Sequence, residues 1–178
     1  MITNKTSLPL GVLRLINNPI VKKRNLSKYI KQLLREEKWL SKKKFQNLYL
    51  VGGTWRALFK LHLFQNKHPV HIIHQYSVNY ETISTFVEKI ASFNKAKLKT
   101  VEYISKSRTP YLPYSSIILD EIMRATNPKN IICSISGIRE GSLAKDYFKN
   151  IDNSQVFEKS LEYISKKRGD LGLTYKKY

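Results

Sequence analysis

The chain has 178 residues, of which 42% are hydrophobic and 25% are charged, and its formal net charge is +19. This length and composition suffice for one globular domain with a hydrophobic core and exclude a disordered chain. Pro9 and Arg14 interrupt the N-terminal apolar run, which argues against a secretory signal, and no apolar stretch reaches the roughly 18 residues of a spanning helix. The single cysteine, Cys133, cannot form an internal disulfide. We therefore expect a cytoplasmic protein without a membrane partner.

The first third of the chain predicts short strands that alternate with helices. Thr6 to Leu10 is predicted as a short strand that ends near Gly11. Asn25 to Leu40 is predicted as a helix, because apolar residues recur at helical spacing: Leu26, Ile30, Leu33 and Leu34. Leu48 to Val51 is an apolar run of strand length. The helix predicted from Thr54 to Phe64 is apolar on nearly all faces, which is typical of a buried helix.

After residue 69 the pattern continues in the same way. Val70 to Tyr76 is predicted to be extended or turn-like, and Tyr80 to Phe93 is predicted as a helix that Asn79 caps. A helix is predicted from Ala96 to Ile104 and another from Pro113 to just before Asn127-Pro128. The remaining predicted elements are a strand, a turn, two helices and a frayed tail: Asn130–Ile135, Ser136–Gly137, Gly141–Phe148, Ser154–Lys167 and Gly169–Tyr178.

The strongest chemical signal is the segment LYLVGGTWR, from Leu48 to Arg56. A strand turns on Gly52 and Gly53 and enters a helix at Thr54. Glycines allow a ligand to approach the backbone, and a helix N-terminus offers free N–H groups and the positive end of the dipole. Such a turn can hold a phosphate or the edge of a nucleotide. The alternative, which the motif alone favours, is a tight turn with Thr54 as an ordinary helix cap.

Three histidines, His68, His71 and His74, repeat every third residue and raise the question of a metal site. In an extended segment successive side chains alternate between faces, so His71 and His74 would point in opposite directions. Pro69 argues against a helix that would bring all three together. We therefore expect no metal ligands in this chain.

The sparse carboxylates predict no catalytic pair. Asp120 and Glu121 are neighbours on a predicted helix, about 100° apart around its axis, so they do not face each other. Glu36 and Glu37 are similar, and a solvated helix surface is expected for all four. We assign no catalytic residue from the sequence.

The net charge of +19 has two explanations that the sequence leaves open. One is a polyanionic partner such as inorganic polyphosphate or RNA, and the other is a codon bias that favours lysine, asparagine and isoleucine. The positive field attracts polyanions whatever its origin. A basic polyanion-binding protein without catalysis is therefore the alternative function.

Four segments, taken together, resemble one family in the same order and at similar spacing. They are Ser7–Gly11 with Leu13–Leu15, Tyr49–Leu58, Arg108 with Leu112–Tyr114, and Ser134 with Gly137–Gly141. The family is that of the exopolyphosphatases and guanosine pentaphosphate phosphatases (Ppx/GppA), which shares the actin-like, ribonuclease-H-like ATPase fold. The resemblance runs from about Thr6 to Asn150.

The resemblance implies an α/β fold in which residues 1–150 form the second half of an actin-like domain and residues 151–178 form a C-terminal helix and tail. It implies a phosphoanhydride hydrolase that uses Mg²⁺ and acts on polyphosphate or guanosine pentaphosphate. By resemblance, the nucleotide-side edge of the cleft is lined by Gly52, Gly53 and Thr54, and Arg108 reaches a phosphate. The expected supporting residues are Arg56, Arg139 and Glu140.

The departure from the family is large, because its two glycine-rich phosphate loops and its catalytic glutamate have no counterpart in this sequence. We therefore expect a fragment that is inactive alone, either a gene remnant or one half of a split enzyme whose other half is a separate chain; a homo-oligomer is also possible. The burial of the helix from Thr54 to Phe64 distinguishes two cases. If the chain itself covers the helix fully, the fold is self-sufficient; if one face is bare, a partner is missing. If the chain proved active alone, Glu140 and Asp120 would be the first acid–base candidates.

Overall fold

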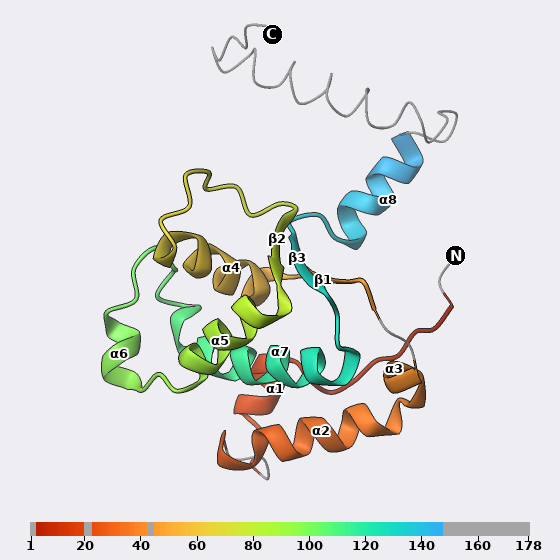
Figure 1. Cartoon of the computed structure of the whole chain (residues 1–178), viewed down its shortest axis with the longest axis horizontal. Coiled ribbons are helices and arrows are strands. Elements are labelled where there is room, and N and C mark those ends of the chain that lie inside the picture. The colour runs from red at the N-terminus through yellow and green to blue at the C-terminus, as the bar shows by residue number, and fades with distance from the viewer. Residues whose placement is uncertain (1–2, 20–22, 43–44, 148–178) are drawn as a thin grey trace, which may run out of the picture. The chain divides into compact units, whose positions relative to one another are not determined.

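The computed structural model describes residues 3–19, 23–42 and 45–147 of the chain. It divides into two compact units, residues 1–135 and 136–178, and each is described by itself. The first unit contains, in order, α1 (Val12–Ile16), the 3₁₀ turn η1 (Lys23–Asn25), α2 (Leu26–Glu36), α3 (Lys38–Lys42), β1 (Asn47–Val51), α4 (Gly53–Gln65), β2 (Tyr76–Asn79), α5 (Tyr80–Ala91), α6 (Lys95–Lys99), the 3₁₀ turn η2 (Thr109–Tyr111), α7 (Leu112–Thr126) and β3 (Asn130–Ser134) (Figure 1). The described helix of the second unit is α8 (Ile138–Tyr147).

The sheet of the first unit has three strands in the order β1-β3-β2. β1 runs parallel to β3, with Asn47 opposite Asn130, and β2 runs antiparallel to β3, with Val78 opposite Ile131. Side chains alternate between the two faces of each strand. Leu50 is buried in the core, whereas the side chains on either side of it in β1 are about half exposed: Tyr49 at 54% and Val51 at 50%.

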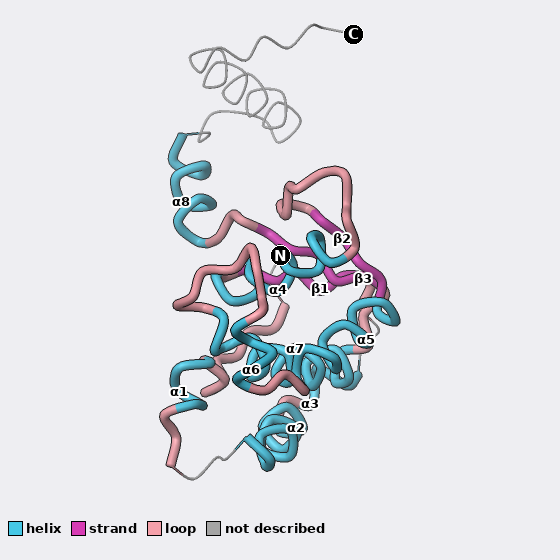
Figure 2. Tube along the Cα trace, turned by 90° about the vertical axis from the view of Figure 1, so that its left-hand side faces the viewer, coloured by secondary structure: helices cyan, strands magenta, loops and turns pink. Residues whose placement is uncertain are grey.

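Two hydrophobic clusters stabilise the first unit by removing apolar surface from water. The first joins the inner face of the sheet to α4, α5 and α7 through residues such as Leu58, Val87 and Leu119. The second packs α1, α2 and α3 against the other side of α7 and includes Ile30 and Ile118. Figures 1 and 2 both show α7 between α4 and α2, so one helix belongs to both clusters.

The predicted strand at Thr6–Leu10 is wrong, because this segment forms neither helix nor strand. Pro9 has no N–H group to donate to a neighbouring strand. Leu8 and Leu10 instead lie half-buried against the second cluster, and the Leu10 N–H donates to the Leu8 carbonyl at 2.8 Å. A short helix that the sequence did not predict, α1, follows this segment.

The predicted helix over Asn25–Leu40 is divided into α2 and α3. The chain leaves helical geometry at Glu37, which has φ −89° and ψ 74°. The Glu37 carboxylate accepts hydrogen bonds from Thr6 Oγ1 at 2.5 Å and from Trp39 Nε1 at 2.9 Å. These side-chain contacts hold the break in place, and helical periodicity does not reveal them.

The helix predicted over Ala96–Ile104 is also wrong in its extent, because α6 ends at Lys99. Tyr103 has a positive φ of 67°, and its ring stacks on Phe64 at a centroid distance of 3.9 Å. This contact between distant residues outweighs local helix propensity. The four-residue strand β2 was not predicted either, because its pairing with β3 defines it more than its own pattern does.

The other elements agree with the prediction to within about three residues. The helices predicted at Thr54–Phe64 and Tyr80–Phe93 are α4 and α5, and the strands predicted at Leu48–Val51 and Asn130–Ile135 are β1 and β3. α8 begins at Ile138 and not at the predicted Gly141. The predicted Ser154–Lys167 helix and the tail lie outside the described residues. None of the described helices is long and apolar enough to cross a membrane.

Candidate functional site

The glycine turn, Gly52 to Thr54, connects β1 to α4. Gly52 has φ 136° and ψ 162°, a conformation that residues with a Cβ rarely adopt. It is the N-cap residue of α4, and no side chain caps the helix. Thr54 is therefore the second residue of α4, and the interpretation of Thr54 as an ordinary cap is wrong. The first N–H groups of α4 thus have no capping side chain to satisfy them.

Arg108, which is 55 residues further along the chain, lies directly against this turn. Its Nη1 donates a hydrogen bond to the Gly53 carbonyl at 2.8 Å. A Cβ placed on Gly53 would lie 3.0 Å from the Cζ, Nη1 and Nη2 atoms of Arg108. The absence of a side chain at Gly53 therefore lets the guanidinium group lie on the backbone. The structure thus brings together Gly52, Gly53, Thr54 and Arg108, the four residues predicted for phosphate or nucleotide binding.

The backbone of Arg108 is fixed by a turn that the sequence did not single out. The Ser105 carbonyl accepts hydrogen bonds from the N–H groups of Arg108, at 2.9 Å, and of Thr109, at 3.1 Å. The hydroxyl of Thr109, which is buried, donates to the same carbonyl at 3.1 Å. The available signal was a serine and a threonine around Arg108 with Pro110 just after them, a composition that favours turns.

Arg56 lies in the first turns of α4 and is half-buried. Its Nε atom is buried and has no hydrogen-bond partner among the described residues. Its charge acts on Cys133 of β3: burial raises the pKa of the Cys133 thiol to about 11, and Arg56 opposes that rise. Arg56 is therefore close to the sheet, and its supporting role stays a prediction.

The other two predicted supporting residues, Arg139 and Glu140, belong to the second unit. Glu140 Oε2 accepts a hydrogen bond from the Gly137 N–H at 2.7 Å, across the start of α8. This is the contact by which a glutamate in the first turn satisfies a free N–H group at a helix start. Arg139 is exposed. Their role at a site stays a prediction.

The three spaced histidines make three different local contacts. His68 Nδ1 accepts a hydrogen bond from the Val70 N–H at 3.1 Å, and His74 Nδ1 accepts one from the Ile135 N–H at 3.3 Å. The His71 ring lies 4.6 Å from the Phe64 ring. Within the part of the chain that the structure describes, no three His, Cys, Asp or Glu side chains gather as metal ligands would.

The prediction of a solvated helix surface is wrong for Glu121, because this residue is buried. It accepts a hydrogen bond from Ser27 Oγ at 2.6 Å, and Lys31 Nζ lies 3.9 Å from it. Asp120 accepts a hydrogen bond from Arg124 Nε at 2.9 Å. Glu121 therefore links α7 to α2, whereas Asp120 pairs with Arg124 one turn further along α7 itself. The Asp120 side chain is only 15% exposed, so the prediction of a solvated surface is wrong for it as well.

Comparison with known proteins identifies the family that this chain resembles. Residues 1–149 match the sequence profile of the Ppx/GppA phosphatase family. A search of curated proteins found no match.

Solved structures with the same fold include a Ppx/GppA family member from Aquifex aeolicus, with a TM-score of 0.62 and 21% identity. They also include an exopolyphosphatase from Cytophaga hutchinsonii, with a TM-score of 0.70 and 15% identity. The matched regions cover 83% and 82% of this chain but 50% of each solved chain. The chain thus spans about half the length of the structures that it matches.

Proposed function

The chain belongs to the Ppx/GppA phosphatase family, and we propose that its glycine turn and Arg108 form the phosphate- and nucleotide-binding edge of a phosphoanhydride hydrolase cleft. The observation that carries this proposal is the guanidinium group of Arg108 at the uncapped start of α4, 2.8 Å from the Gly53 carbonyl. Two sources of positive charge, the side chain and the helix N-terminus, thereby meet at one place.

This arrangement suits a terminal phosphate for a simple reason. A guanidinium group has five N–H donors, and one is used at Gly53, so others remain for phosphate oxygens. Gly52 and Gly53 present backbone without side chains that would keep a ligand away. Phosphoryl transfer depends mainly on positioning and on neutralisation of charge, and this edge supplies both.

The substrate class that follows is inorganic polyphosphate or guanosine pentaphosphate. In hydrolysis, the water oxygen bonds to the terminal phosphorus, and the bond from that phosphorus to the bridging oxygen breaks. The bridging oxygen stays on the shortened chain, which is the leaving group, and the terminal phosphoryl group is released as inorganic phosphate. That step needs a group to take the water's proton. The two acid–base candidates, Asp120 and Glu140, already accept hydrogen bonds, from Arg124 Nε and from the Gly137 N–H. We propose that this chain alone does not catalyse the step and that complementary phosphate loops complete the cleft.

The family implies Mg²⁺, and the described residues of the glycine turn do not fit this ion. Mg²⁺ prefers carboxylate, phosphate and water oxygens, whereas the turn offers Arg108 and helix N–H groups, which favour anions. No described cluster of His, Cys, Asp or Glu offers another place for it. We therefore assign no step of the reaction to a metal held by this chain.

The first test is phosphate release from polyphosphate and from guanosine pentaphosphate with Mg²⁺ present, using the full chain alone and then with a polypeptide that carries the family's phosphate loops. The expected result is release only in the mixture. Release by the chain alone at a rate typical of enzymes would contradict the inactivity proposal.

The second test addresses the site itself. Arg108→Gln should weaken binding of guanosine pentaphosphate to the full chain by tenfold or more, whereas Arg14→Gln, at an exposed arginine of α1, should leave it unchanged. Equal effects of the two changes would show that the overall charge, and not the glycine turn, binds the ligand.

A second candidate function, a polyanion-binding protein without catalysis, is favoured by the net charge of +19 and by the burial of α4. The described side chains of α4 that are buried occupy most of its length: Ala57, Leu58, Phe59, Leu61, His62 and Leu63. The helix is covered within the first unit, which favours a self-sufficient fold. Polyphosphate or RNA binding that weakens steeply with added salt, without any phosphate release in the mixture above, would support this function.

A further inference from the structure

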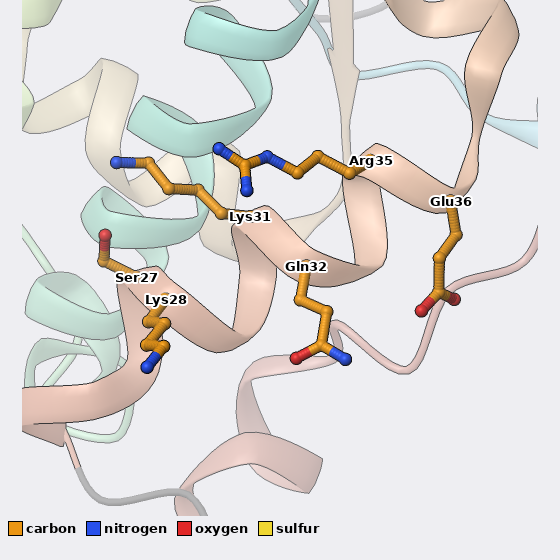
Figure 3. Close-up of a pocket in the computed structure, with 6 residues that line it drawn as sticks. All are labelled: Ser27, Lys28, Lys31, Gln32, Arg35 and Glu36. Carbon is orange, nitrogen blue, oxygen red and sulfur yellow. The ribbon is translucent and has the colours of Figure 1, made fainter.

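A hollow of about 250 Å³ lies between the C-terminal end of α4 and the segment that contains α6. Its lining includes two aromatic side chains, Phe64 and Tyr103, and two charged ones, Lys97 and Glu102. We call it the α4–α6 hollow. The larger hollow on α2, of about 640 Å³, is lined by polar and charged side chains alone (Figure 3), so it has no ring on which a base can stack.

Tyr103 presents its ring to solvent from an uncommon backbone conformation. Its φ is 67°, in the left-handed region that bulky residues rarely adopt. One face of the ring lies on Phe64, with the two centroids 3.9 Å apart and the two planes 6° apart. Tyr103 is nevertheless 57% exposed, so the other face of its ring remains available for stacking. Strained positions of this kind concentrate where ligands bind.

The two charged side chains of the hollow are both exposed, and neither has an ion pair with any described residue. The Glu102 carboxylate also makes no hydrogen bond within the part of the chain that the structure describes, so both of its oxygens can accept from donors on a ligand. Lys97 Nζ lies 5.9 Å from the centroid of the Phe93 ring, which also lines the hollow. The hollow thus offers a stacking face, an acceptor group and a donor group.

This combination matches the polar edge of one nucleobase. Guanine has two adjacent donors, N1–H and N2–H, which one carboxylate accepts together, and beside them the acceptor O6, to which a lysine donates. Adenine has an acceptor at N1, where guanine has a donor, so a carboxylate at that place disfavours it. Stacking alone accepts every base, because every base has a π-face. Glu102 is therefore the residue that selects the base.

We propose that the α4–α6 hollow is a guanine pocket, in which the base stacks on Tyr103, Glu102 accepts hydrogen bonds from N1–H and N2–H, and Lys97 donates one to O6. The nucleotide is guanosine pentaphosphate, one of the two substrate classes of the proposed function, and the placement of its phosphates rests on that function. Recognition of the base rests on the hollow alone. Polyphosphate has no base and does not use this pocket.

One face of α4 connects the hollow to the glycine turn. Gly53 and Phe64 are 11 residues apart in the sequence. That separation is three helical turns plus about 20°, so the two residues share a face, with about 16 Å of helix axis between them. Exposed Lys60 lies between them on this face, and its Nζ is 5.9 Å from the Phe64 ring centroid. A guanosine with three phosphates in a row has a comparable length, so its base and its terminal phosphate reach both ends.

The segment 103–108 follows the same face of α4. Tyr103 stacks on Phe64 at one end of the segment. At the other end, Arg108 donates its hydrogen bond to the Gly53 carbonyl. The guanine pocket and the proposed phosphate-binding edge are therefore built from the same two parts of the chain, α4 and the segment before α7.

The test compares the binding of guanosine pentaphosphate and of the corresponding adenosine pentaphosphate to the full chain by titration calorimetry. Glu102→Gln removes the carboxylate and keeps the size of the side chain. The matched control, Glu36→Gln, removes an exposed carboxylate from the α2 hollow (Figure 3) and changes the net charge by the same amount. Thermal unfolding checks that both variants are folded.

The original protein and Glu36→Gln should bind the guanosine compound about tenfold more tightly than the adenosine compound, the usual value of a bidentate contact to a base. In Glu102→Gln this preference should disappear, whereas polyphosphate binding should match that of Glu36→Gln. A protein without the preference, or a Glu102→Gln variant that keeps it, would overturn the guanine pocket.

Tyr103 is tested by two further substitutions. Tyr103→Ala should weaken binding of both nucleotides about tenfold, the usual value of one stacked base, and leave polyphosphate binding unchanged. Tyr103→Phe keeps the ring and should bind both nucleotides as the original does. Equal losses in the two variants would show that the ring face does not hold the base.

The proposed cleft and the guanine pocket can fail independently. Arg108→Gln acts on phosphates, so it should weaken both pentaphosphates by a similar factor and leave the preference for guanine unchanged. If Glu102→Gln removes the preference while Arg108→Gln changes nothing, the guanine pocket stands and the cleft does not. If Arg108→Gln weakens binding and Glu102→Gln keeps the preference, the cleft stands and the pocket does not.

Discussion

At the scale of single residues, the two neighbouring glycines of the turn have different physical roles. Gly52 needs its glycine for its backbone conformation, φ 136°, whereas Gly53 needs its glycine for the space that the Arg108 guanidinium fills. Backbone strain cannot be relieved by a neighbour, but the end of a flexible side chain can move. The two positions should therefore respond differently to the same substitution.

Gly52→Ala should lower the free energy of unfolding by about 1–3 kcal/mol, the usual cost of a residue held in a sparsely populated conformation. Gly53→Ala should change the free energy of unfolding by less than about 1 kcal/mol, because only the Arg108 side chain must shift, yet it should weaken guanosine pentaphosphate binding as Arg108→Gln does. Urea unfolding of the two variants measures the first difference. Equal destabilisation would contradict the roles assigned to the two glycines.

His62 of α4 provides a prediction of pH dependence. It is buried, its Nδ1 lies 3.0 Å from the Tyr76 hydroxyl, and its ring meets Phe86 edge-on. Burial, assisted by the charge of His68, lowers the pKa of His62 below its usual value of 6.5. The unfolded state therefore binds more protons than the folded state below about pH 6.5. Stability that is present above that pH is lost as the pH falls toward the folded pKa.

We expect the free energy of unfolding to decrease between pH 7 and pH 5 and His62→Gln to remove much of that decrease. His71→Gln, at an exposed histidine, is the matched control and should keep it. Urea unfolding at several pH values measures both. The assignment to His62 would be wrong if the His62→Gln protein lost stability between pH 7 and pH 5 as steeply as the original.

At the scale of secondary structure, the two asparagines that precede α5 and α2 offer a matched comparison. Asn79 Oδ1 accepts a hydrogen bond from the Thr82 N–H at 2.8 Å, as a capping side chain does. Asn25 precedes α2 but makes no capping hydrogen bond with its side chain. Of the two asparagines, only Asn79 therefore caps its helix with its side chain.

Asn79→Ala should reduce the free energy of unfolding by about 1 kcal/mol, the typical value of an N-cap. Asn25→Ala should reduce it by a few tenths of that amount at most. Guanidinium or urea unfolding of both variants gives the comparison. A larger loss from Asn25→Ala would mean that the capping geometry described for α5 does not determine its stability.

The elements that the sequence predicted well are those that carry their own pattern. α5 has both a cap and an apolar stripe, and β1 ends at a glycine pair, so local signals locate them. The elements that it missed depend on distant residues: the break at Glu37 depends on Thr6, and the end of α6 accompanies the stack of Tyr103 on Phe64. Such contacts between residues far apart in the chain cannot be predicted from the pattern of a single sequence.

The candidate site also contains residues that local sequence signals predict and residues that they do not. The glycine motif predicted Gly52 and Gly53, because their conformation and spacing are local properties. Resemblance to a family suggested Arg108, and no spacing rule could have placed a residue 55 positions away against Gly53. Ser105 and Thr109, which fix the backbone of Arg108, were missed because ordinary turn residues carry no sign of what they support.

At the scale of the whole molecule, the net charge of +19 should make stability depend on salt. Like charges repel in the compact state, and added salt screens that repulsion. The melting temperature should therefore rise by several degrees between low salt and about 0.5 M sodium chloride. Thermal unfolding followed by circular dichroism measures the change, and a melting temperature that falls over this range would show that ion pairs such as Arg124 with Glu88 outweigh the repulsion.

The order of the sheet has a consequence for the way in which the protein is made. The central strand, β3, is the last of the three to be synthesised, and its Asn130 pairs with Asn47, 83 residues earlier. Until β3 leaves the ribosome, β1 and β2 have no described partner strand, and their unpaired backbone N–H and C=O groups stay open to other chains. Contacts between such distant residues also slow folding. The emerging chain therefore carries two unpaired strands through most of its synthesis, and the arrival of a single five-residue segment closes the sheet.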